Sequence, residues 1–179
     1  MEPSSSSQSP QQSQPHPTPG ALDSISTNYR AFIAQAGLDY KQHQEAAVSW
    51  CCNIEVNGID IDEKTMKCGL IADEMGLGKT IEILGTMYCN PLSKTLVVVP
   101  RALLEQWKNA IISSLSADVL VHHGKTAKTP HLLETAHIVV TTYGMISLKK
   151  KHQHKKIHKI EWDRIIFDKA HHVKKMKTC

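Results

Sequence analysis

The sequence predicts an α/β fold in which helices cover both faces of a parallel sheet. Apolar, β-branched runs of strand length alternate with segments whose apolar residues recur at helical spacing. Strands that are apolar throughout are typical of parallel sheets buried on both faces. A glycine-bearing turn, Gly76-Leu77-Gly78-Lys79-Thr80, lies between one such run and one such helix. Strand, glycine turn and helix, in that order, are the layout of a phosphate-binding loop.

The first 27 residues are expected to form a disordered tail. Residues 1–20 are mostly Ser, Gln and Pro, including four consecutive serines and three prolines at alternate positions. Such a segment cannot bury enough apolar area to offset the chain entropy that folding costs. A Pro-rich docking motif is the alternative, but a plain tail explains the composition more simply. The folded domain would then span residues 28–179.

Three helices and one strand are expected between residues 28 and 90. Two helices, residues 28–36 and 38–50, precede the glycine turn, and Asp39 is a candidate N-cap for the second. The polar residues 57–67 indicate a surface connection, and residues 68–72 a buried strand that leads into the turn. The helix after the turn has apolar residues at helical spacing, namely Ile81, Ile83, Leu84 and Met87.

The rest of the chain continues the alternation. Apolar runs predict strands at residues 95–99, 117–121, 137–141 and 164–168. Between the first two, Leu103, Leu104, Trp107 and Ile111 recur at helical spacing. Ligands of open parallel sheets bind at the carboxyl ends of the strands. The glycine turn, Thr141-Thr142 and Asp168 all lie at such ends, so we expect the functional site there.

The residue types in the glycine turn suit an anion. Gly76 and Gly78 allow backbone dihedrals and close approaches that a Cβ would block. Freed backbone amides and the helix N-terminus then face a phosphate. Lys79 would reach the β- and γ-phosphates, and the Thr80 hydroxyl would ligate magnesium. The strict pattern begins with a further glycine, where this chain has Asp73; the alternative is a glycine-rich helix start with a solvated lysine.

Charge is distributed unevenly along the chain. Residues 1–148 carry 10 Lys/Arg and 14 Asp/Glu, whereas residues 149–179 carry 11 and 3. Such asymmetry is typical of nucleic-acid contact or of a nuclear address. The five cysteines show no paired spacing, which favours reduced thiols. No apolar run reaches the length of a membrane span and no signal core is apparent, so we expect no membrane partner.

Four separated motifs then line up in order. They are Gln42, Asp73–Thr80, Leu96–Trp107 and Val139–Gly144. Together they resemble the N-terminal RecA-like lobe of the Swi/Snf-type helicase-like ATPases, within the superfamily-two DNA translocases. The resemblance is strongest to the DNA-repair and transcription-linked branch and covers roughly residues 38–175. It implies an incomplete RecA-like phosphate-loop NTPase lobe, and it explains Asp73, because that family carries an acid at this position.

The resemblance implies an ATP site with magnesium. Gln42 would read the adenine, and Thr80 with Asp168 would hold the magnesium ion. Lys79, Asp168 and Lys169 would occupy the catalytic positions. The implied nucleotide-binding set is Gln42, Asp73, Glu74, Met75, Gly76, Leu77, Gly78, Lys79 and Thr80.

The resemblance also implies contact with double-stranded DNA or chromatin. The implied DNA-contacting residues are Arg101, Gln106, Trp107, Thr141 and Thr142. A hydroxyl at a strand end can bond a phosphate without reading sequence, so the binding would be sequence-independent. For Trp107, a role as an anchor between helix and sheet is the alternative.

Two departures from the family pattern limit the expected activity. The box expected as Asp-Glu-Ala-His is Asp168-Lys169-Ala170-His171, so Lys169 replaces the glutamate that would polarise water. An ammonium group is no base at neutral pH unless it is strongly desolvated. The chain also ends at Cys179, before the rest of the first lobe and the second lobe. A partner would have to supply that lobe and its arginines, which stabilise phosphoryl transfer.

These observations predict a nuclear, ATP-binding lobe of a DNA-dependent ATPase of the chromatin-remodelling or DNA-repair type, deficient in hydrolysis. Whether the chain is itself an enzyme is left open. The alternative is a non-enzymatic DNA- or protein-binding fragment that uses the basic residues 149–159.

Overall fold

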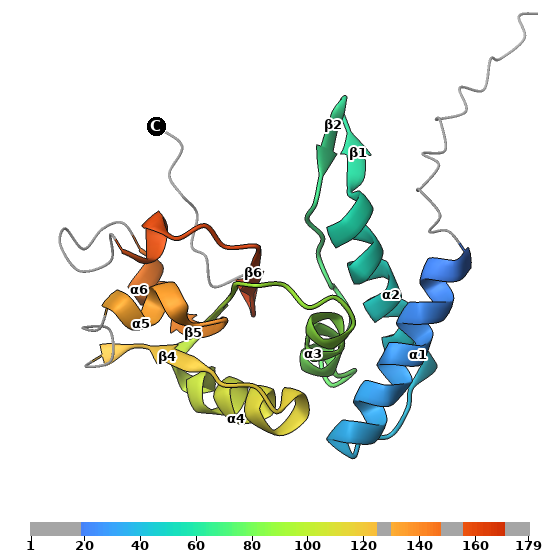
Figure 1. The fold of residues 1–179 in the computed structure, drawn as a ribbon, viewed down its shortest axis with the longest axis horizontal. Helices are drawn as coiled ribbons and strands as arrows, with labels where there is room; N and C mark the ends of the chain where they lie inside the picture. The colour runs from blue at the N-terminus through green and yellow to red at the C-terminus, as the bar shows by residue number, and fades with distance from the viewer. Residues whose placement is uncertain (1–18, 125–129, 148–155, 171–179) are drawn as a thin grey trace, which may run out of the picture.

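The computed structural model describes residues 19–124, 130–147 and 156–170. Figure 1 shows two groups of elements side by side. One group consists of helices α1, α2 and α3 with a small hairpin. The other is a sheet with helix α4 on one side and the short helices α5 and α6 on the other. This is the α/β organisation that the sequence predicts.

The main sheet has four strands, all parallel, in the order β4-β5-β3-β6. The strands are β3 (Thr95–Val99), β4 (Leu120–His122), β5 (Ile138–Thr142) and β6 (Arg164–Phe167). Strand β3 coincides with the predicted strand, and β5 is displaced by one residue. The weakest of the predicted strands also has the least accurate boundary, because β4 begins three residues later than expected.

The helices flank these strands in the predicted alternation. They are α1 (Pro19–Ala36), α2 (Gln42–Asn57), α3 (Lys79–Cys89), α4 (Leu104–Leu115), α5 (Pro130–Thr135) and α6 (Tyr143–Ile146), with short 3-10 turns η1 (Arg101–Leu103) and η3 (Ile157–Lys159). The candidate N-cap Asp39 is wrong, because Lys41 precedes α2 without a side-chain cap. In the described ranges, no helix combines the length and apolarity needed to cross a membrane.

Alternate residues of β3 point into two separate apolar clusters. Val97 and Val99 pack with α1, α3 and α4, where Leu84 and Ile111 are fully buried. Leu96 and Val98 face the other way and pack with Leu133 of α5 and Ile157 of η3. All five residues of β3 are buried. The period of two along a strand therefore builds a core on each face, as expected for a covered parallel sheet.

Helix α1 begins before the predicted boundary of the disordered tail. It starts at Pro19, nine residues ahead of the expected helix start, so residues 19–27 are helical. Tyr29 and Phe32 of α1 are fully buried against α2 and α3. Tertiary packing of one apolar face can extend a helix through residues of poor intrinsic propensity. The first 18 residues lie outside the described part of the chain.

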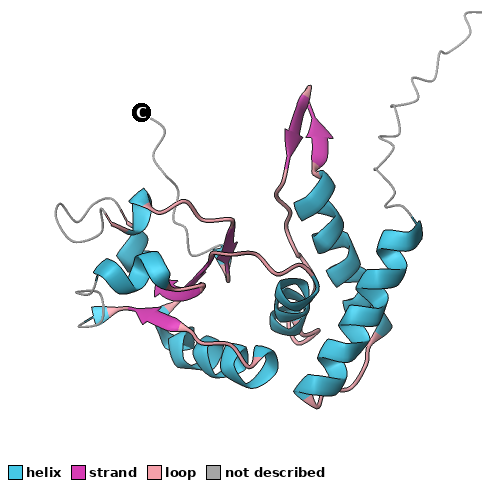
Figure 2. Ribbon diagram, in the orientation of Figure 1, coloured by secondary structure: helices cyan, strands magenta, loops and turns pink. Residues whose placement is uncertain are grey.

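The segment that leads into the glycine turn also differs from expectation. Residues 68–72 were predicted to form a buried strand, but they have no regular secondary structure, and Figure 2 shows them as loop. Leu70 is 74% exposed. Upstream, the expected surface connection contains an antiparallel hairpin, β1 (Ile59–Ile61) and β2 (Lys64–Met66). Its two turn residues, Asp62 and Glu63, both have positive φ, as a two-residue hairpin turn of this twist requires.

A partly buried ion pair joins α2 to the start of β6. Arg164 donates from Nε and Nη2 to the two carboxylate oxygens of Glu55, each at 2.5 Å. Arg164 Nη2 also donates to the Asn90 carbonyl at 2.7 Å, and Asn90 Nδ2 donates to Glu55 at 2.7 Å. Bidentate pairing of this kind fixes the geometry of both partners. The contacts among Arg164, Glu55 and Asn90, called here the clamp, therefore set the position of α2 relative to the sheet.

Replacing Arg164 with Ala is expected to lower the free energy of unfolding by about 3 kcal/mol, because it leaves the Glu55 carboxylate partly buried without its partner. Urea denaturation followed by circular dichroism measures the change. Lys108→Ala is the control, since it removes an exposed pair with Glu105 whose loss should cost about 0.5 kcal/mol or less. Equal stability losses in the two variants would contradict this account of the clamp.

Candidate functional site

The glycine turn has the backbone geometry that its sequence predicts. Gly76 has φ of 97° and Gly78 has φ of 91°, both in the region that disfavours side chains. Gly78 occupies the N-cap position, and α3 begins at Lys79. A Cβ on Gly78 would lie 2.2 Å from Gln44 Nε2, whereas one on Gly76 would meet open space. Gly78 is therefore required both for its dihedral and for close approach to α2.

The Lys79 side chain closes the turn on itself. Its ammonium donates to the Asp73 carbonyl at 2.7 Å and to the Glu74 carbonyl at 2.8 Å. The two acceptors are backbone oxygens at the start of the turn, so the lysine spans the loop from its helical end. An ammonium held only by neutral carbonyls can exchange them for charged phosphate oxygens, which form stronger hydrogen bonds.

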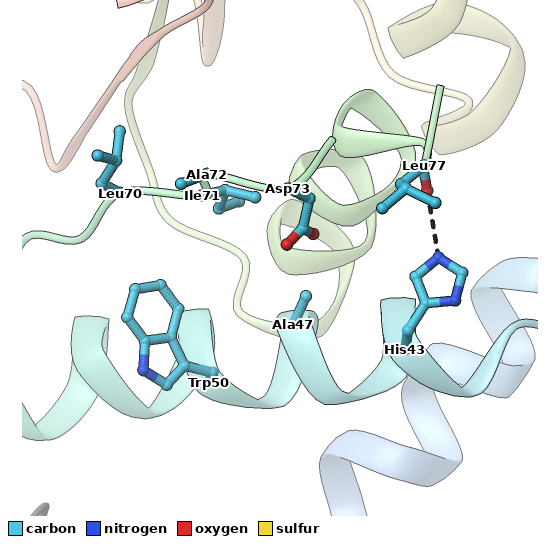
Figure 3. A pocket seen from close by; sticks show the side chains of 8 residues that line it. All are labelled: His43, Ala47, Trp50, Leu70, Ile71, Ala72, Asp73 and Leu77. Atoms are coloured by element: carbon cyan, nitrogen blue, oxygen red, sulfur yellow. Dashed lines mark hydrogen bonds between the residues drawn. The ribbon is translucent and has the colours of Figure 1, made fainter. Parts of the chain in front are cut away.

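Helix α2 contacts the turn through Gln44 and not through Gln42. Gln42 is exposed at the first position of the helix, and its contact with the adenine stays a prediction. Gln44 is buried, donates from Nε2 to the Leu77 carbonyl at 2.9 Å and accepts from Tyr29 Oη at 3.3 Å. His43 Nε2 lies 3.3 Å from the same carbonyl (Figure 3). Gln44 and the buried Val48 are four residues apart and share one face of α2, so this spacing in the sequence could have indicated the burial of Gln44.

A cavity of about 360 Å³ lies between α2 and the segment that leads into the turn, which is near the lower limit for small-molecule sites. Figure 3 shows Trp50 and Leu70 toward one end and His43 with Leu77 at the other, and Asp73 projects into the space between. The lining residues are His43, Ala47, Trp50, Leu70, Ile71, Ala72, Asp73 and Leu77. A planar apolar group would find an aromatic wall here, next to the anion-binding turn.

Glu82 is a buried acid that the sequence analysis does not single out. It lies on α3, is fully buried, and neither carboxylate oxygen has a hydrogen-bond partner among the described residues. Burial, and then the negative charge of Asp73, raise the pKa of Glu82 to about 7. Acids are common in the first turn of a helix, where they interact favourably with the helix dipole. The position of Glu82 in the sequence therefore gives no indication that its side chain is buried.

Asp168 is held at the carboxyl end of β6 by three contacts. Its N–H donates to the Val98 carbonyl at 3.0 Å, as in the sheet. Its Oδ2 accepts from Trp107 Nε1 at 2.8 Å, and its carbonyl accepts from Tyr143 Oη at 2.6 Å. Lys169 follows with a positive φ of 53° and is exposed.

The two predicted magnesium ligands offer suitable atoms. A hydroxyl from Thr80 and a carboxylate from Asp168 are hard oxygen donors, the type that magnesium prefers. Trp107 donates to Oδ2 of Asp168. The other carboxylate oxygen accepts no hydrogen bond from the described residues, so it is available to a cation. The donor chemistry of the two residues is therefore compatible with this ion, although the described residues include no group of three or more His, Cys, Asp or Glu side chains that could hold a metal.

The predicted DNA-contacting residues fall into two groups. Arg101 and Gln106 are exposed. Trp107, Thr141 and Thr142 are buried, so direct DNA contact through these side chains is not available in this structure. Thr141 Oγ1 donates to the His122 carbonyl at 2.9 Å, because the end of β5 packs beside β4. For Trp107, the alternative of an anchor between α4 and the sheet is confirmed.

The basic run at residues 149–159 lies mostly outside the described part of the chain, since residues 148–155 are not described. Its last residues form η3, in which Ile157 is buried in the second apolar cluster. This end of the run therefore packs against the lobe. The prediction that the run contacts DNA stays untested.

The fold and the glycine turn define the class of the protein, a RecA-like α/β lobe. The chain belongs to the SNF2-related domain family, whose model matches residues 43–179. Among solved structures, the Sulfolobus solfataricus SWI2/SNF2 ATPase core in complex with dsDNA superposes with a TM-score of 0.63 at 26% identity, covering 78% of this chain and 28% of that chain. The predicted family and fold are confirmed.

Relatives of known sequence are longer proteins. An ATP-dependent helicase of Schizosaccharomyces pombe is 30% identical over 165 residues, covering 76% of this chain and 15% of the relative. DNA repair protein RAD5 of Yarrowia lipolytica is 33% identical over 140 residues, covering 65% and 14%. The human SWI/SNF-related matrix-associated actin-dependent regulator of chromatin subfamily A member 1 is 28% identical over 155 residues, covering 79% and 14%. The chain spans about one seventh of the length of these relatives.

The buried Glu82 carboxyl makes stability depend on pH. Its pKa in the folded chain, about 7, lies above the ordinary value of 4.5. The stabilisation by the bound proton is complete below the ordinary pKa and is lost as pH rises through about 7. We therefore expect Glu82→Gln to be more stable than the wild type at pH 8, by up to about 3 kcal/mol, and nearly equal in stability at pH 4.

Urea denaturation at both pH values measures this difference, with the exposed Glu161→Gln as the control variant. A stability difference between wild type and Glu82→Gln that stays constant from pH 4 to pH 8 would show that Glu82 is not protonated preferentially in the folded chain.

Proposed function

We propose that the chain binds ATP at the turn between Asp73 and Thr80, as the N-terminal lobe of a DNA-dependent ATPase of the chromatin-remodelling or DNA-repair type. The observation that carries the proposal is the glycine turn at the start of α3, with two positive-φ glycines and a lysine whose ammonium, within the described part of the chain, is held by two backbone carbonyls. Membership of the SNF2-related family and the adjoining cavity support it.

Each part of the site has a role in this proposal. Lys79 exchanges its two carbonyl partners for the β- and γ-phosphates, and the amides at the start of α3 complete the anion site. The base enters the cavity beside Trp50, and Gln44 supports the floor of the turn through Leu77. Thr80 and Asp168 hold the magnesium ion, which, when bound, neutralises phosphate charge.

The proposed partner is double-stranded DNA or chromatin, bound without sequence preference. The solved structure that this chain resembles is a complex with dsDNA, and the relatives include chromatin-remodelling and DNA-repair proteins. These relatives also support a nuclear location. Of the predicted DNA-contacting residues, Arg101 and Gln106 remain candidates, because their side chains are exposed. A second lobe, from this protein or a partner, would complete the DNA groove.

The proposal includes weak or absent hydrolysis by these 179 residues. Lys169 is exposed and stands at the position where the family pattern has a glutamate, and an ammonium group does not replace a carboxylate as a general base. Loss of a general base typically costs about 10²–10⁴-fold in rate. Binding of ATP does not require that base, so binding and turnover are separable properties here.

Lys79→Ala is expected to weaken ATP binding by roughly 10- to 100-fold, which corresponds to the loss of a charge-assisted hydrogen bond. Isothermal titration calorimetry on the full chain measures the affinity, and thermal melts establish that the variant is folded. The exposed Lys108→Ala is the control and should bind as the wild type does. Equal, weak binding by the wild type and Lys79→Ala would end the proposal.

We further expect ATP incubated with the full chain to yield ADP no faster than the protein-free background, and Lys169→Glu to leave this result unchanged. The arginines that stabilise phosphoryl transfer in this family are expected on a second lobe, which the 179 residues do not include. Release of inorganic phosphate, with and without double-stranded DNA, measures the rate. DNA-stimulated turnover by Lys169→Glu alone would contradict the requirement for a second lobe.

A further inference from the structure

Two aromatic side chains from different elements converge on Asp168. Trp107, on α4, donates its indole N–H to Oδ2 at 2.8 Å. Tyr143, the first residue of α6, donates its hydroxyl to the Asp168 carbonyl at 2.6 Å. One contact orients the carboxylate, and the other restrains the backbone that carries it. Neither contact is needed to build the sheet, where Asp168 is already bonded to Val98.

We propose that Trp107 and Tyr143 are positioning residues, which hold the Asp168 carboxylate in the orientation that receives the cation accompanying ATP. The inference rests on the proposed function. It gives Trp107 a role that differs from the predicted one, and it gives Tyr143 a role where none was predicted. Trp107 was predicted to contact DNA, and Tyr143 was not predicted to act at all.

The surroundings of Trp107 make its contact a rigid one. Its side chain is only 3% exposed and packs in the larger apolar cluster with Val97 and Ile111. An indole N–H can donate a hydrogen bond but cannot accept one, so a buried indole must keep its acceptor to remain hydrogen-bonded. Its acceptor is one of two carboxylate oxygens, and the bond therefore leaves the second oxygen to a metal ion in one fixed orientation.

The Tyr143 ring is restrained as well. It stacks on Phe167, with ring centroids 6.3 Å apart and an interplanar angle of 23°. Phe167 immediately precedes Asp168, so the stacking and the hydroxyl bond both act on the end of β6. Partners that orient a metal-ligating side chain typically contribute about 10- to 100-fold to metal affinity. That magnitude makes the effect of these residues measurable by cation-dependent binding.

The chain offers a matched control for the loss of an indole bond. Trp162 Nε1 donates to the Ile157 carbonyl at 3.0 Å, which is a bond from the same indole donor to a neutral backbone acceptor in a different part of the lobe. Trp162→Phe removes that bond without touching Asp168. For the tyrosine, Tyr40→Phe removes a hydroxyl that donates to Glu45 on α2. If losing an indole or tyrosine hydrogen bond lowers ATP affinity for a general reason, the two control variants should show the same loss.

The experiment measures the affinity of the full chain for ATP, once with excess MgCl₂ and once in EDTA. It compares the wild type with Trp107→Phe, Tyr143→Phe, Trp162→Phe and Tyr40→Phe, and thermal melts report folding. We expect the ratio of the two affinities, which measures the contribution of magnesium, to fall about tenfold in Trp107→Phe and in Tyr143→Phe. The ratio should not change in the two controls.

A spectroscopic readout separates positioning from packing. In ¹H–¹⁵N spectra, the Trp107 indole signal should shift when MgCl₂ is added to the ATP-bound chain, while the Trp162 signal should stay in place. Tyr143→Phe is the milder variant, since it keeps the ring that stacks on Phe167. It therefore tests the inference even if Trp107→Phe fails to fold.

Two results would overturn the inference while leaving the proposed function intact. One is an unchanged magnesium ratio in folded Tyr143→Phe and Trp107→Phe. The other is an equal loss of affinity with and without magnesium, which would indicate a purely structural role. A wild type that binds no ATP in either condition would overturn the proposed function, and the inference with it.

Discussion

The structure depends on covering both faces of strand β3. All five of its residues are buried, and they alternate between two apolar clusters built from different helices. An apolar strand of this kind is stable only when packed on each side, so α3 and α4 must lie on one face and α5 with η3 on the other. Its two neighbours, β5 and β6, pair with it in parallel and take their register from it.

This arrangement places Asp168 at the end of a strand and outside the two apolar clusters, where it stays partly exposed. Val98 of β3 accepts the Asp168 N–H, so the position of the acid follows from the position of the central strand. The glycine turn is placed less directly. It rests on α2 through Gln44, and α2 is joined to β6 by the pairing of Glu55 with Arg164. Disturbing that ion pair would therefore alter the turn from a distance.

The two acids near the site illustrate how environment assigns different roles to the same chemical group. Glu82 is fully buried with no hydrogen-bond partner among the described residues, and burial raises its pKa to about 7. Asp168 is partly exposed and accepts a hydrogen bond from Trp107, which leaves an oxygen for a cation. For Glu82, burial without a partner favours the neutral form of the carboxyl.

Elements with local signals could be predicted from the amino-acid sequence. The apolar run of β3, the helical spacing in α4 and the glycines of the turn each depend on a few consecutive residues, and all three appear as predicted. The burial of particular side chains could not be predicted in this way. The tertiary structure placed Gln44 against the turn, buried Thr141 within the sheet, and brought Trp107 to Asp168 across 61 positions of sequence. The spacing of residues along one element cannot encode such contacts, because burial is set by elements distant in the chain.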